Sequence, residues 1–282
     1  MATAAAALDA ASRTLAAAGV ENARREARLL LAHTLGVGPA ALIAEPARRL
    51  DPEVEARFAA LVARRARREP FSHLVGVREF WSLDFAVNSD VLDPRPDSET
   101  LVQTALDLFP DGDAPLDVLD LGTGSGCLLL SLLAERKGAR GLGIDISAPA
   151  LRVAAVNAVR LGLAARATFR KGDWGDGLDA TFDLILCNPP YIARGAIDSL
   201  EPEVARFDPL AALDGGVDGY DAYRALAPHL ARLLSPRGVA VIEAGDGQAT
   251  EINRIFRISG LPVADVRRDL AGRERCIVLR VH

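Results

Sequence analysis

The sequence predicts an α/β protein in which a parallel sheet, covered by helices on both faces, follows a purely helical segment. From residue 93 onward, short apolar strands alternate with helical stretches, which is the pattern of such a sheet. Before residue 70, apolar residues recur only at helical spacing. The chain has 282 residues, half of them apolar, so it can bury a large core and has room for two domains.

The first segment, residues 1–69, is expected to be a small helical bundle. Ala27–Leu35 carries apolar residues at helical spacing, and Gly36 is a plausible stop after it. Asp51 and Pro52 are typical of the N-cap and the first position of a further helix. A bundle of this size is too small to carry obvious chemistry of its own.

Basic residues gather at the end of this bundle. Residues 1–75 hold 11 Arg against 8 acidic residues. The excess comes mainly from Arg64, Arg65, Arg67 and Arg68. One interpretation is a solvated helix end, where cations complement the helix dipole. The other is a contact surface for RNA or for an acidic protein.

Residues 70–92 change period and are predicted to form a hairpin connector. Apolar side chains alternate with polar or small ones, which indicates a half-buried strand. The alternating apolar residues are Trp81, Leu83, Phe85 and Val87. The remainder, residues 93–282, is then the sheet-bearing domain.

Strands of this domain are predicted from apolar runs that end in glycine or polar residues. The expected strands are Asp117–Leu121, Gly141–Ile146, Phe182–Cys187, Gly238–Ala244, Val263–Arg267 and Ile277–Val281, and the expected helices include Leu128–Ala134 and Pro149–Leu161. Ligands of parallel sheets bind at the carboxyl ends of the strands. Functional residues are therefore expected directly after these strands.

A glycine-rich loop follows the first strand. It consists of Gly122, Thr123, Gly124, Ser125 and Gly126. The G-x-G-x-G spacing is shorter than the G-x-G-x-x-G of dinucleotide folds, which favours S-adenosylmethionine, a cofactor without a pyrophosphate. Asp120, just before the loop, can lie near the positively charged amino end of that cofactor. The competing interpretation is an ordinary glycine-rich turn between strand and helix.

Two further strand ends carry acids. Asp145 lies 23 residues beyond Gly122, where an acid can accept both hydroxyls of a ribose. An N-cap role is the alternative for Asp145, although Ser147 is better placed to cap the next helix. Asp173 and Trp174 fall where another strand should end and can meet the adenine, while Trp174 can also be a core aromatic.

The loop after the Phe182–Cys187 strand sets the expected chemistry. Its sequence is Asn188-Pro189-Pro190-Tyr191. The prolines fix φ and remove two N–H donors, so their carbonyl oxygens remain acceptors without a neighbouring donor. Asn188 adds a side-chain oxygen, and Tyr191 can pack on a planar group. Such a loop can hold both hydrogens of an –NH2 group and orient its nitrogen toward an activated methyl group. A plain turn would rarely combine these four residues.

Other chemistries find little support in the sequence. Cys127, Cys187 and Cys276 lie far apart beside apolar runs, so they are expected to be reduced core residues, and no metal site is expected. The net charge of −5 gives no sign of a nucleic acid backbone as the main partner. No apolar stretch approaches the ~20 residues that span a membrane, so a soluble protein is expected, and the reduced cysteines favour the cytoplasm.

These motifs resemble the peptide chain release factor glutamine methyltransferase family, and the resemblance runs from the N-terminal helices to the C-terminus. The matching segments are VLDPRPDSETLV at 91–102, VLDLGTGSGC at 118–127, GIDIS, GDW, NPPYI, residues 201–226, EAGDGQ at 243–248 and the terminal GRERCIVLR. Two differences lie in the first segment. Asp93 replaces an apolar residue, and Asp97-Ser98-Glu99 replaces the usual E-T-E.

The resemblance implies a fold, a reaction and a set of site residues. The fold is a seven-stranded, Rossmann-like class I methyltransferase domain with a β-hairpin connector and an N-terminal helical bundle that would help hold the substrate. The reaction is methylation, by S-adenosylmethionine, of the side-chain amide nitrogen of the Gly-Gly-Gln glutamine in class 1 release factors. S-adenosylhomocysteine is the product. The residues from Gly122 to Gly126, Asp145, Trp174 and Asn188 would bind the cofactor, and Asn188 to Tyr191 would hold the glutamine. A monomer is expected.

Two other functions remain open at this point. The Asn-Pro-Pro-Tyr loop alone also resembles enzymes that methylate amino groups of adenine or guanine in nucleic acid. A protein that keeps the cofactor fold without the chemistry is a further alternative, which the intact loop disfavours. Residues 201–226 and the N-terminal helices favour the release factor enzymes, and a chain of 282 residues leaves little room for a DNA-reading domain. Stable nucleic acid binding is therefore not expected.

Overall fold

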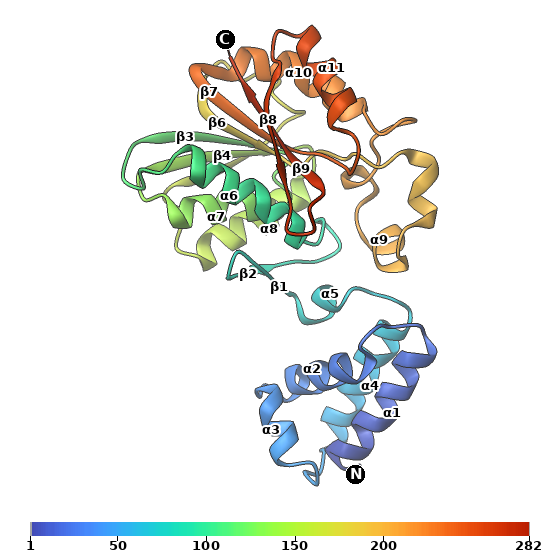
Figure 1. Cartoon of the computed structure of the whole chain (residues 1–282). Coiled ribbons are helices and arrows are strands. Elements are labelled where there is room, and N and C mark those ends of the chain that lie inside the picture. Colours follow the sequence, from blue (N-terminus) through green and yellow to red (C-terminus); the bar gives the residue numbers. More distant parts are fainter. Residues whose placement is uncertain (1, 282) are drawn as a thin grey trace. The chain divides into compact units, whose positions relative to one another are not determined.

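The computed structural model describes residues 2–281, which divide into two compact units (Figure 1). One unit runs up to Gly76 and includes Glu201–Phe207, and the other consists of Val77–Leu200 and the chain from Asp208 onward. This division differs from the predicted boundaries at residues 69 and 92. The short helix after residue 70 packs with the bundle, whereas the hairpin packs with the sheet. The functions assigned to the three predicted segments stay predictions.

The first unit is helical, as predicted. Its elements are α1 (Ala4–Ala17), α2 (Ala23–Leu35), α3 (Pro39–Ala44), α4 (Pro52–Ala66), α5 (Phe71–Val75) and α9 (Pro202–Phe207). Gly36 follows α2 with a φ of 65°, a left-handed conformation that glycine adopts without strain. Pro52 opens α4 as predicted, whereas the Asp51 side chain makes no capping hydrogen bond within the described residues. Leu30 and Phe58 lie in the core between these helices.

Arg64, Arg65 and Arg68 are paired with acidic residues of their own unit, so these three do not form the free contact surface that one interpretation expected. Arg64 and Arg65 lie in the last turn of α4, which agrees with the helix-end interpretation. Arg65 is 5% exposed and donates to Glu26 at 2.5 Å and to Glu203 at 2.8 Å. Arg68 also donates to Glu203, at 2.6 Å. Burial acts to raise the pKa of Glu203, but the hydrogen bonds from the two arginines hold it below its usual value. Arg64 is paired in turn with Glu69. The cluster therefore serves to fix α9 within its own unit.

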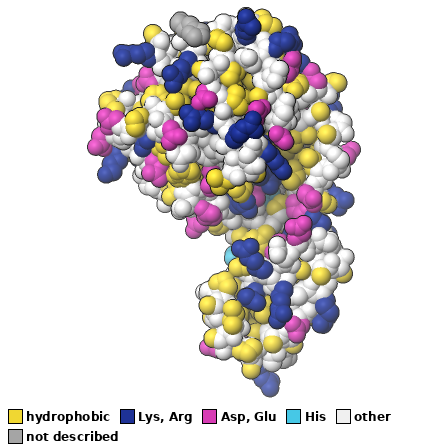
Figure 2. Space-filling model, in the orientation of Figure 1, with side chains coloured by type: hydrophobic (Ala, Val, Ile, Leu, Met, Phe, Trp, Pro, Cys, Tyr) yellow, Lys and Arg dark blue, Asp and Glu magenta, His cyan; other side chains and the backbone are white. Residues whose placement is uncertain are grey.

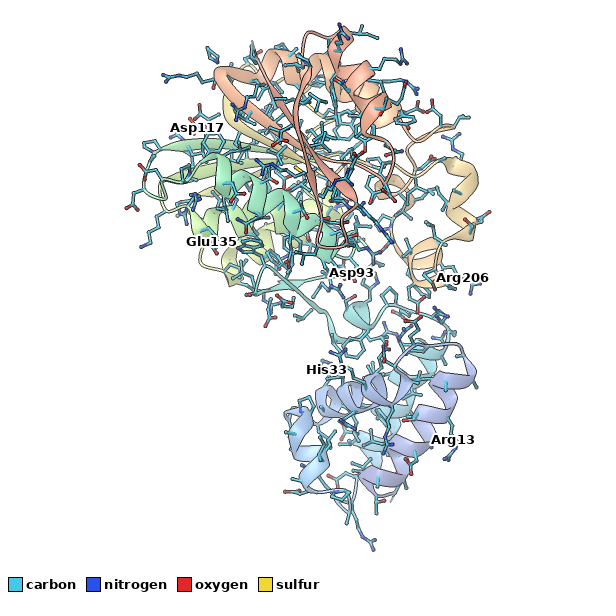
Figure 3. The ribbon with its side chains drawn as sticks, viewed as in Figure 1. Arg13, His33, Asp93, Asp117, Glu135 and Arg206 are labelled. Atoms are coloured by element: carbon cyan, nitrogen blue, oxygen red, sulfur yellow. The ribbon has the colours of Figure 1, made fainter. Side chains whose placement is uncertain are left out.

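Replacing Arg65 by Ala should strongly destabilise this helical unit. Removing one partner of a buried ion pair costs about 3–5 kcal/mol, because the remaining charges stay buried without compensation. Urea unfolding of the full chain, with a fluorescent label on α1, measures this loss. Arg13→Ala on the exposed face of α1 (Figure 3) removes the same charge at a site that has no ion pair with any described residue, and it should change little. Equal unfolding midpoints for the two variants would contradict the structural role of Arg65.

The predicted hairpin is present, but its turn lies where the alternating pattern placed a strand. β1 (Val77–Phe80) and β2 (Leu83–Ala86) pair antiparallel. Trp81 and Ser82 form the turn with φ values of 53° and 58°. The turn is supported by a neighbouring carboxylate, since the backbone N–H of Trp81 donates to Glu99 Oε1 at 2.8 Å. The prediction of a continuous strand through Trp81 is therefore wrong, because an alternation of apolar residues does not reveal a two-residue turn inside it.

Seven strands in residues 2–281 form the main sheet, and this confirms the predicted α/β architecture with its helical bundle and hairpin. The elements are α6 (Glu99–Leu108), β3 (Leu116–Leu121), α7 (Cys127–Glu135), β4 (Ala139–Asp145), α8 (Ala148–Arg160), β5 (Ala167–Lys171), β6 (Phe182–Cys187), α10 (Asp221–Leu233), β7 (Leu234–Glu243), α11 (Ala249–Ile258), β8 (Val263–Arg268) and β9 (Glu274–Arg280). Three short 3-10 turns, η1 (Pro96–Ser98), η2 (Arg194–Ser199) and η3 (Leu210–Ala212), complete the described part of this unit. The predicted strands lie within a few residues of the observed ones, and β5 appears where only a strand end was expected.

The strand order of the sheet is β5-β4-β3-β6-β7-β9-β8, with β9 antiparallel to its neighbours. Helices α6 and α7 pack on one face, and α10 and α11 on the other (Figure 1). From β3 the chain first builds outward through β4 and β5, and then returns to place β6 against the opposite side of β3. The carboxyl ends of β3 and β6 thus meet at the point where the winding reverses, which is where open α/β sheets bind ligands.

Candidate active site

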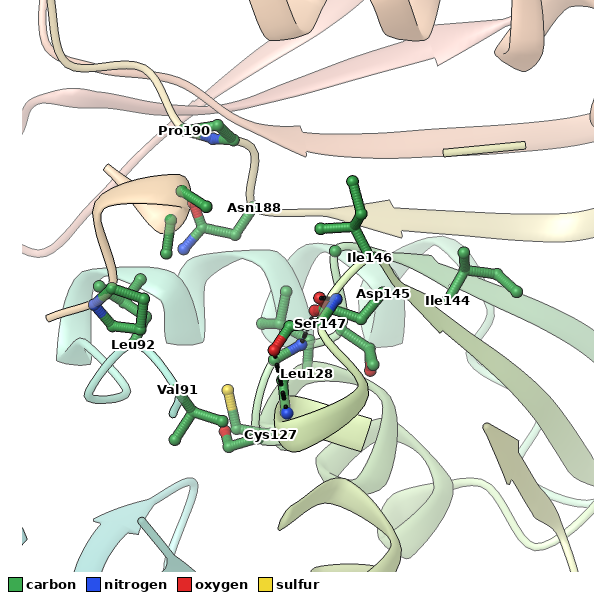
Figure 4. A pocket seen from close by; sticks show the side chains of 18 of the residues that line it. Val91, Leu92, Cys127, Leu128, Ile144, Asp145, Ile146, Ser147, Asn188 and Pro190 are labelled. Atoms are coloured by element: carbon green, nitrogen blue, oxygen red, sulfur yellow. Dashed lines mark hydrogen bonds between the residues drawn. The ribbon is translucent and has the colours of Figure 1, made fainter. Parts of the chain in front are cut away.

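A cavity of about 390 Å³ opens at this reversal point (Figure 4). Small-molecule sites have volumes of about 300–1,000 Å³, so the cavity can hold a compact ligand. The predicted site residues on its wall are Gly122, Thr123, Gly124, Ser125, Asp145, Asp173, Trp174, Asn188 and Pro190. The predicted residues that do not reach the wall are Asp120, Gly126, Pro189 and Tyr191. The structure thus brings the glycine-rich loop and the Asn-Pro-Pro-Tyr loop to one cavity.

The glycine-rich loop needs its glycines for conformation and for packing. Gly122 and Gly124 have φ values of 73° and 54°, in the left-handed region. The backbone N–H of Gly124 donates to Asp145 Oδ2 at 2.8 Å, which ties the loop to the end of β4. Gly126 lies behind the loop, where a Cβ would come within 3.1 Å of Leu130 and 3.3 Å of Ala154. Gly126 therefore allows close helix packing and does not face the cavity.

Asp145 lies on the cavity wall at the end of β4 (Figure 4). Its two carboxylate oxygens accept from the backbone N–H groups of Gly124 and Ser147, each at 2.8 Å. Each oxygen keeps a further lone pair, so the group can still accept hydrogen bonds from a ligand. Ser147 caps α8 by accepting from the N–H of Ala150 at 3.2 Å. The capping function thus belongs to Ser147, as the sequence indicated.

Asp120 is buried beneath the glycine-rich loop. Its Oδ2 accepts from Thr123 Oγ1 at 2.6 Å, and its Oδ1 has no hydrogen-bond partner within the described residues. Burial raises the pKa of Asp120 to about 7. A buried carboxylate with a spare oxygen favours a nearby cation. This arrangement fits a positively charged ligand group bound above the loop.

Asp173 and Trp174 line the cavity from the segment after β5. The Trp174 ring reaches Gly122, since a Cβ on that glycine would lie 3.9 Å from the ring. Trp174 also packs against the core beneath α10, which agrees with its interpretation as a core aromatic, while its contact with adenine stays a prediction. Ile146 was not predicted, although its side chain is 59% exposed on the cavity wall. An apolar residue that follows an acid at a strand end was the available signal for an apolar side chain on this wall.

The Asn-Pro-Pro-Tyr loop presents its acceptors at the end of β6. Asn188 and Pro190 lie on the wall (Figure 4). Pro189 is buried. Its carbonyl group belongs to the peptide bond with Pro190, whose ring nitrogen carries no hydrogen. In the described part of the chain, no hydrogen bond ends on the carbonyl oxygen of Pro189 or Pro190. Both carbonyl oxygens are therefore acceptors without a partner among the described residues, in the same loop that carries the Asn188 amide.

Tyr191 does not reach the cavity wall. Its hydroxyl group contacts Glu243, which in turn binds Ser98, and neither of these two was predicted as a site residue. Its hydroxyl donates to Glu243 Oε1 at 3.2 Å. Ser98 donates to the other oxygen of Glu243 at 2.5 Å and accepts from Asn188 Nδ2 at 3.2 Å. Glu243 is 1% exposed, and burial raises its pKa to about 7. An acid at the end of an apolar strand next to β6 was the signal that could have identified Glu243.

The segment that differs from the family pattern forms part of this site. Arg95 and Ser98 lie on the cavity wall. Arg95 is paired with Asp208 at 2.5 Å, and the variant Asp93 is 5% exposed with a long ion pair of 3.7 Å to Arg78. Burial raises the pKa of Asp208 to about 6. The segment therefore contributes to the wall of the same cavity that the glycine-rich loop lines.

Several other features bear on the chemistry. No group of three His, Cys, Asp or Glu side chains that could hold a metal occurs in residues 2–281. Cys127, Cys187 and Cys276 are free, and burial raises the pKa of the Cys127 thiol on the cavity wall to about 12. Within the same described range, no helix is long and apolar enough to cross a bilayer. On the face drawn in Figure 2, basic and acidic side chains are interspersed.

The sheet order, the glycine-rich loop and the cavity at the reversal point define a class I methyltransferase. A methyltransferase domain model matches residues 113–260, and a PrmC N-terminal domain model matches residues 6–76. A methyltransferase from Pyrococcus furiosus shares the fold, with a TM-score of 0.50 and 15% identity over 82% of this chain and 98% of that one.

Two relatives that match nearly the whole chain identify its family more closely than the shared fold does. The release factor glutamine methyltransferase of Rhodospirillum rubrum is 50% identical over 97% of this chain and 83% of its own length. That of Caulobacter vibrioides is 44% identical over 95% of this chain and 93% of its own. The chain belongs to the release factor glutamine methyltransferase family.

Proposed function

We propose that this enzyme methylates the side-chain amide nitrogen of the Gly-Gly-Gln glutamine in class 1 release factors, with S-adenosylmethionine as the methyl donor. The observation that carries the proposal is the position of Asn188 on the wall of the same cavity as the glycine-rich loop, in a loop whose two proline carbonyl oxygens accept no hydrogen bond within residues 2–281. S-adenosylhomocysteine would be the product. The same proposal makes the protein a monomeric, cytoplasmic enzyme that acts in translation termination.

The cavity residues fit this cofactor by their chemistry. Asp145 would accept the ribose hydroxyls, while Asp173, Trp174 and Ile146 would contact the adenine. The loop from Gly122 to Gly126, with Asp120 beneath it, would hold the positively charged amino end. The spare Oδ1 of Asp120 supports this assignment, because a nearby cation would stabilise the ionised form of the buried carboxyl.

The Asn-Pro-Pro-Tyr loop would orient the substrate nitrogen. When bound, S-adenosylmethionine supplies a methyl group activated by the sulfonium charge. Asn188 Oδ1 and the Pro189 carbonyl oxygen would each accept one hydrogen of the glutamine –NH2. An amide lone pair is otherwise delocalised into its own carbonyl, and holding both hydrogens turns the nitrogen toward the methyl group. The enzyme would thus act mainly through orientation and electrostatics.

Transfer of radiolabelled methyl groups tests this function. Purified class 1 release factor, duplex DNA and ribosomal RNA are each incubated with the enzyme and labelled cofactor. We expect label only in the release factor, and peptide mass analysis should locate it on the Gly-Gly-Gln glutamine. A release factor with that glutamine replaced by alanine is the control and should stay unlabelled. Label in nucleic acid but not in release factor would overturn the proposal.

A further inference from the structure

Glu243, Tyr191 and Ser98, of which only Ser98 reaches the cavity wall, form a hydrogen-bonded chain that ends at the Asn188 amide. Glu243 at the end of β7 accepts from Ser98 Oγ at 2.5 Å, and Ser98 Oγ accepts from Asn188 Nδ2 at 3.2 Å. The second oxygen of Glu243 accepts from the Tyr191 hydroxyl at 3.2 Å. Ser98 and Glu243 are 2% and 1% exposed, so water does not compete freely for these groups. The chain connects η1, β7 and the Asn-Pro-Pro-Tyr loop.

The direction of each hydrogen bond in this chain follows from its members. An ionised carboxylate can only accept, whereas a hydroxyl has a single hydrogen to donate. Ser98 donates that hydrogen to Glu243, so only its lone pairs remain to accept a hydrogen bond from Asn188. Those lone pairs select the NH2 end of the Asn188 amide. The oxygen end is then left to face the cavity.

This choice matters because the two ends of an asparagine amide are nearly equal in shape but opposite in hydrogen bonding. An amide turned the other way would present N–H donors to the –NH2 of a substrate, which needs acceptors. We propose that Ser98 and Glu243 are positioning residues that hold Asn188 with its oxygen toward the substrate nitrogen. This inference rests on the proposed function, since it specifies how Asn188 receives the glutamine amide.

The charges around Glu243 make the chain sensitive to pH. Burial raises the pKa of Glu243 to about 7, while the hydrogen bond from Ser98 and the positive charge of Arg275 oppose the rise. The other titratable or charged groups facing it are Asp97, Cys127, Cys187, Tyr191, Tyr223 and Cys276. Below a pH of about 7 the protonated carboxyl can itself donate to Ser98. The Ser98 hydrogen is then released toward Asn188, and the selection of the amide orientation is lost.

Steady-state kinetics of methyl transfer to release factor test the inference. Ser98→Ala should lower kcat about ten-fold or more, which corresponds to the loss of one buried hydrogen bond, with KM and cofactor affinity nearly unchanged. Ser98→Thr keeps the hydroxyl and should recover most of the lost activity. Ser131→Ala is the matched control, because Ser131 is equally buried in this unit but its hydroxyl has no partner within the described residues. A wild-type kcat for Ser98→Ala would overturn the inference.

Glu243→Gln isolates the pH effect. This side chain keeps the shape but does not titrate, so the ratio of wild-type kcat to Glu243→Gln kcat should fall as the pH drops through about 7. Asp120 also titrates near this pH, but it is present in both proteins and cancels in the ratio. A ratio independent of pH would contradict the proposal that Glu243 positions Asn188 through Ser98.

A measurement without turnover separates this inference from the proposed function. The side-chain amide signals of Asn188 are assigned in the NMR spectrum by comparison with Asn188→Ala, and their hydrogen exchange is followed in the cofactor-free protein. We expect protection of one amide hydrogen in wild type and its loss in Ser98→Ala. Equal exchange in both proteins would refute the positioning of Asn188 by Ser98. Failure of the wild-type enzyme to label release factor would instead refute the proposed function, and the exchange result would still stand.

Discussion

Replacing Asn188 by Ala should nearly abolish methyl transfer while cofactor binding falls only modestly. The side chain lies on the cavity wall, held through Nδ2 by Ser98, so its oxygen is available to the substrate nitrogen. Losing one preorganised group of this kind lowers kcat by about 10²–10³-fold. Single-turnover methyl transfer to release factor measures the loss, and calorimetric titration measures cofactor affinity.

The comparison needs a variant that changes an asparagine without touching the cavity. Asn253→Ala on the exposed face of α11 serves this purpose and should retain the wild-type kcat. Circular dichroism establishes that both variants are folded. If Asn188→Ala remained folded but lost cofactor binding as completely as methyl transfer, Asn188 would be chiefly a cofactor residue, and the assignment of its oxygen to the glutamine would be wrong.

Replacing Asp145 by Ala should weaken cofactor binding by about 1–3 kcal/mol, the cost of leaving buried polar partners without an acceptor. In affinity this is about a 5–150-fold rise in Kd. The carboxylate already accepts from the backbone of Gly124 and Ser147 and has lone pairs left for two ribose hydroxyls. Titration of the cofactor into the purified variant gives the Kd directly.

A control for Asp145 must remove the same charge elsewhere in the same unit. Asp179→Ala does so at an exposed position outside the cavity wall and should bind the cofactor normally. Asp145→Asn keeps one acceptor oxygen and should fall between wild type and Asp145→Ala. An unchanged Kd for Asp145→Ala would exclude the ribose contact.

The sequence predicted the sheet and the cavity loops well because each depends on local patterns. Buried strands of a parallel sheet are short apolar runs, and β6 was predicted at its observed bounds, Phe182–Cys187. The glycine-rich loop and the Asn-Pro-Pro-Tyr loop follow such strands directly. Their meeting at one cavity then follows from the position of β6 next to β3, which the general rule for strand ends anticipates.

What the sequence could not predict depends on contacts between distant residues. Arg65 looked like part of a basic surface, because its partner Glu203 lies 138 residues away in a different part of the chain. The interaction of Ser98 with Glu243 spans 145 residues. The turn at Trp81 and Ser82 replaced a predicted strand because left-handed φ values at such residues leave no signature in an alternating pattern.

Tyr191 illustrates the same limit within a recognised motif. A tyrosine after two prolines suggested a ring packed on the substrate, yet its hydroxyl is directed to Glu243 and its ring packs against the core. Burial raises the pKa of Tyr191, so the hydroxyl remains a donor. The direction of a side chain after a rigid loop is set by tertiary neighbours, and these are not readable from the motif.

We expect Asn188 Oδ1 and the Pro189 carbonyl oxygen to accept the two hydrogens of the glutamine amide. A crystal structure of the enzyme with S-adenosylhomocysteine and a peptide carrying Gly-Gly-Gln tests this most directly. We predict that the glutamine nitrogen lies within about 3.2 Å of both oxygens, the range of a normal hydrogen bond. A complex in which Asn188 is turned out of the cavity, or in which the glutamine oxygen occupies the place of its nitrogen, would contradict the account.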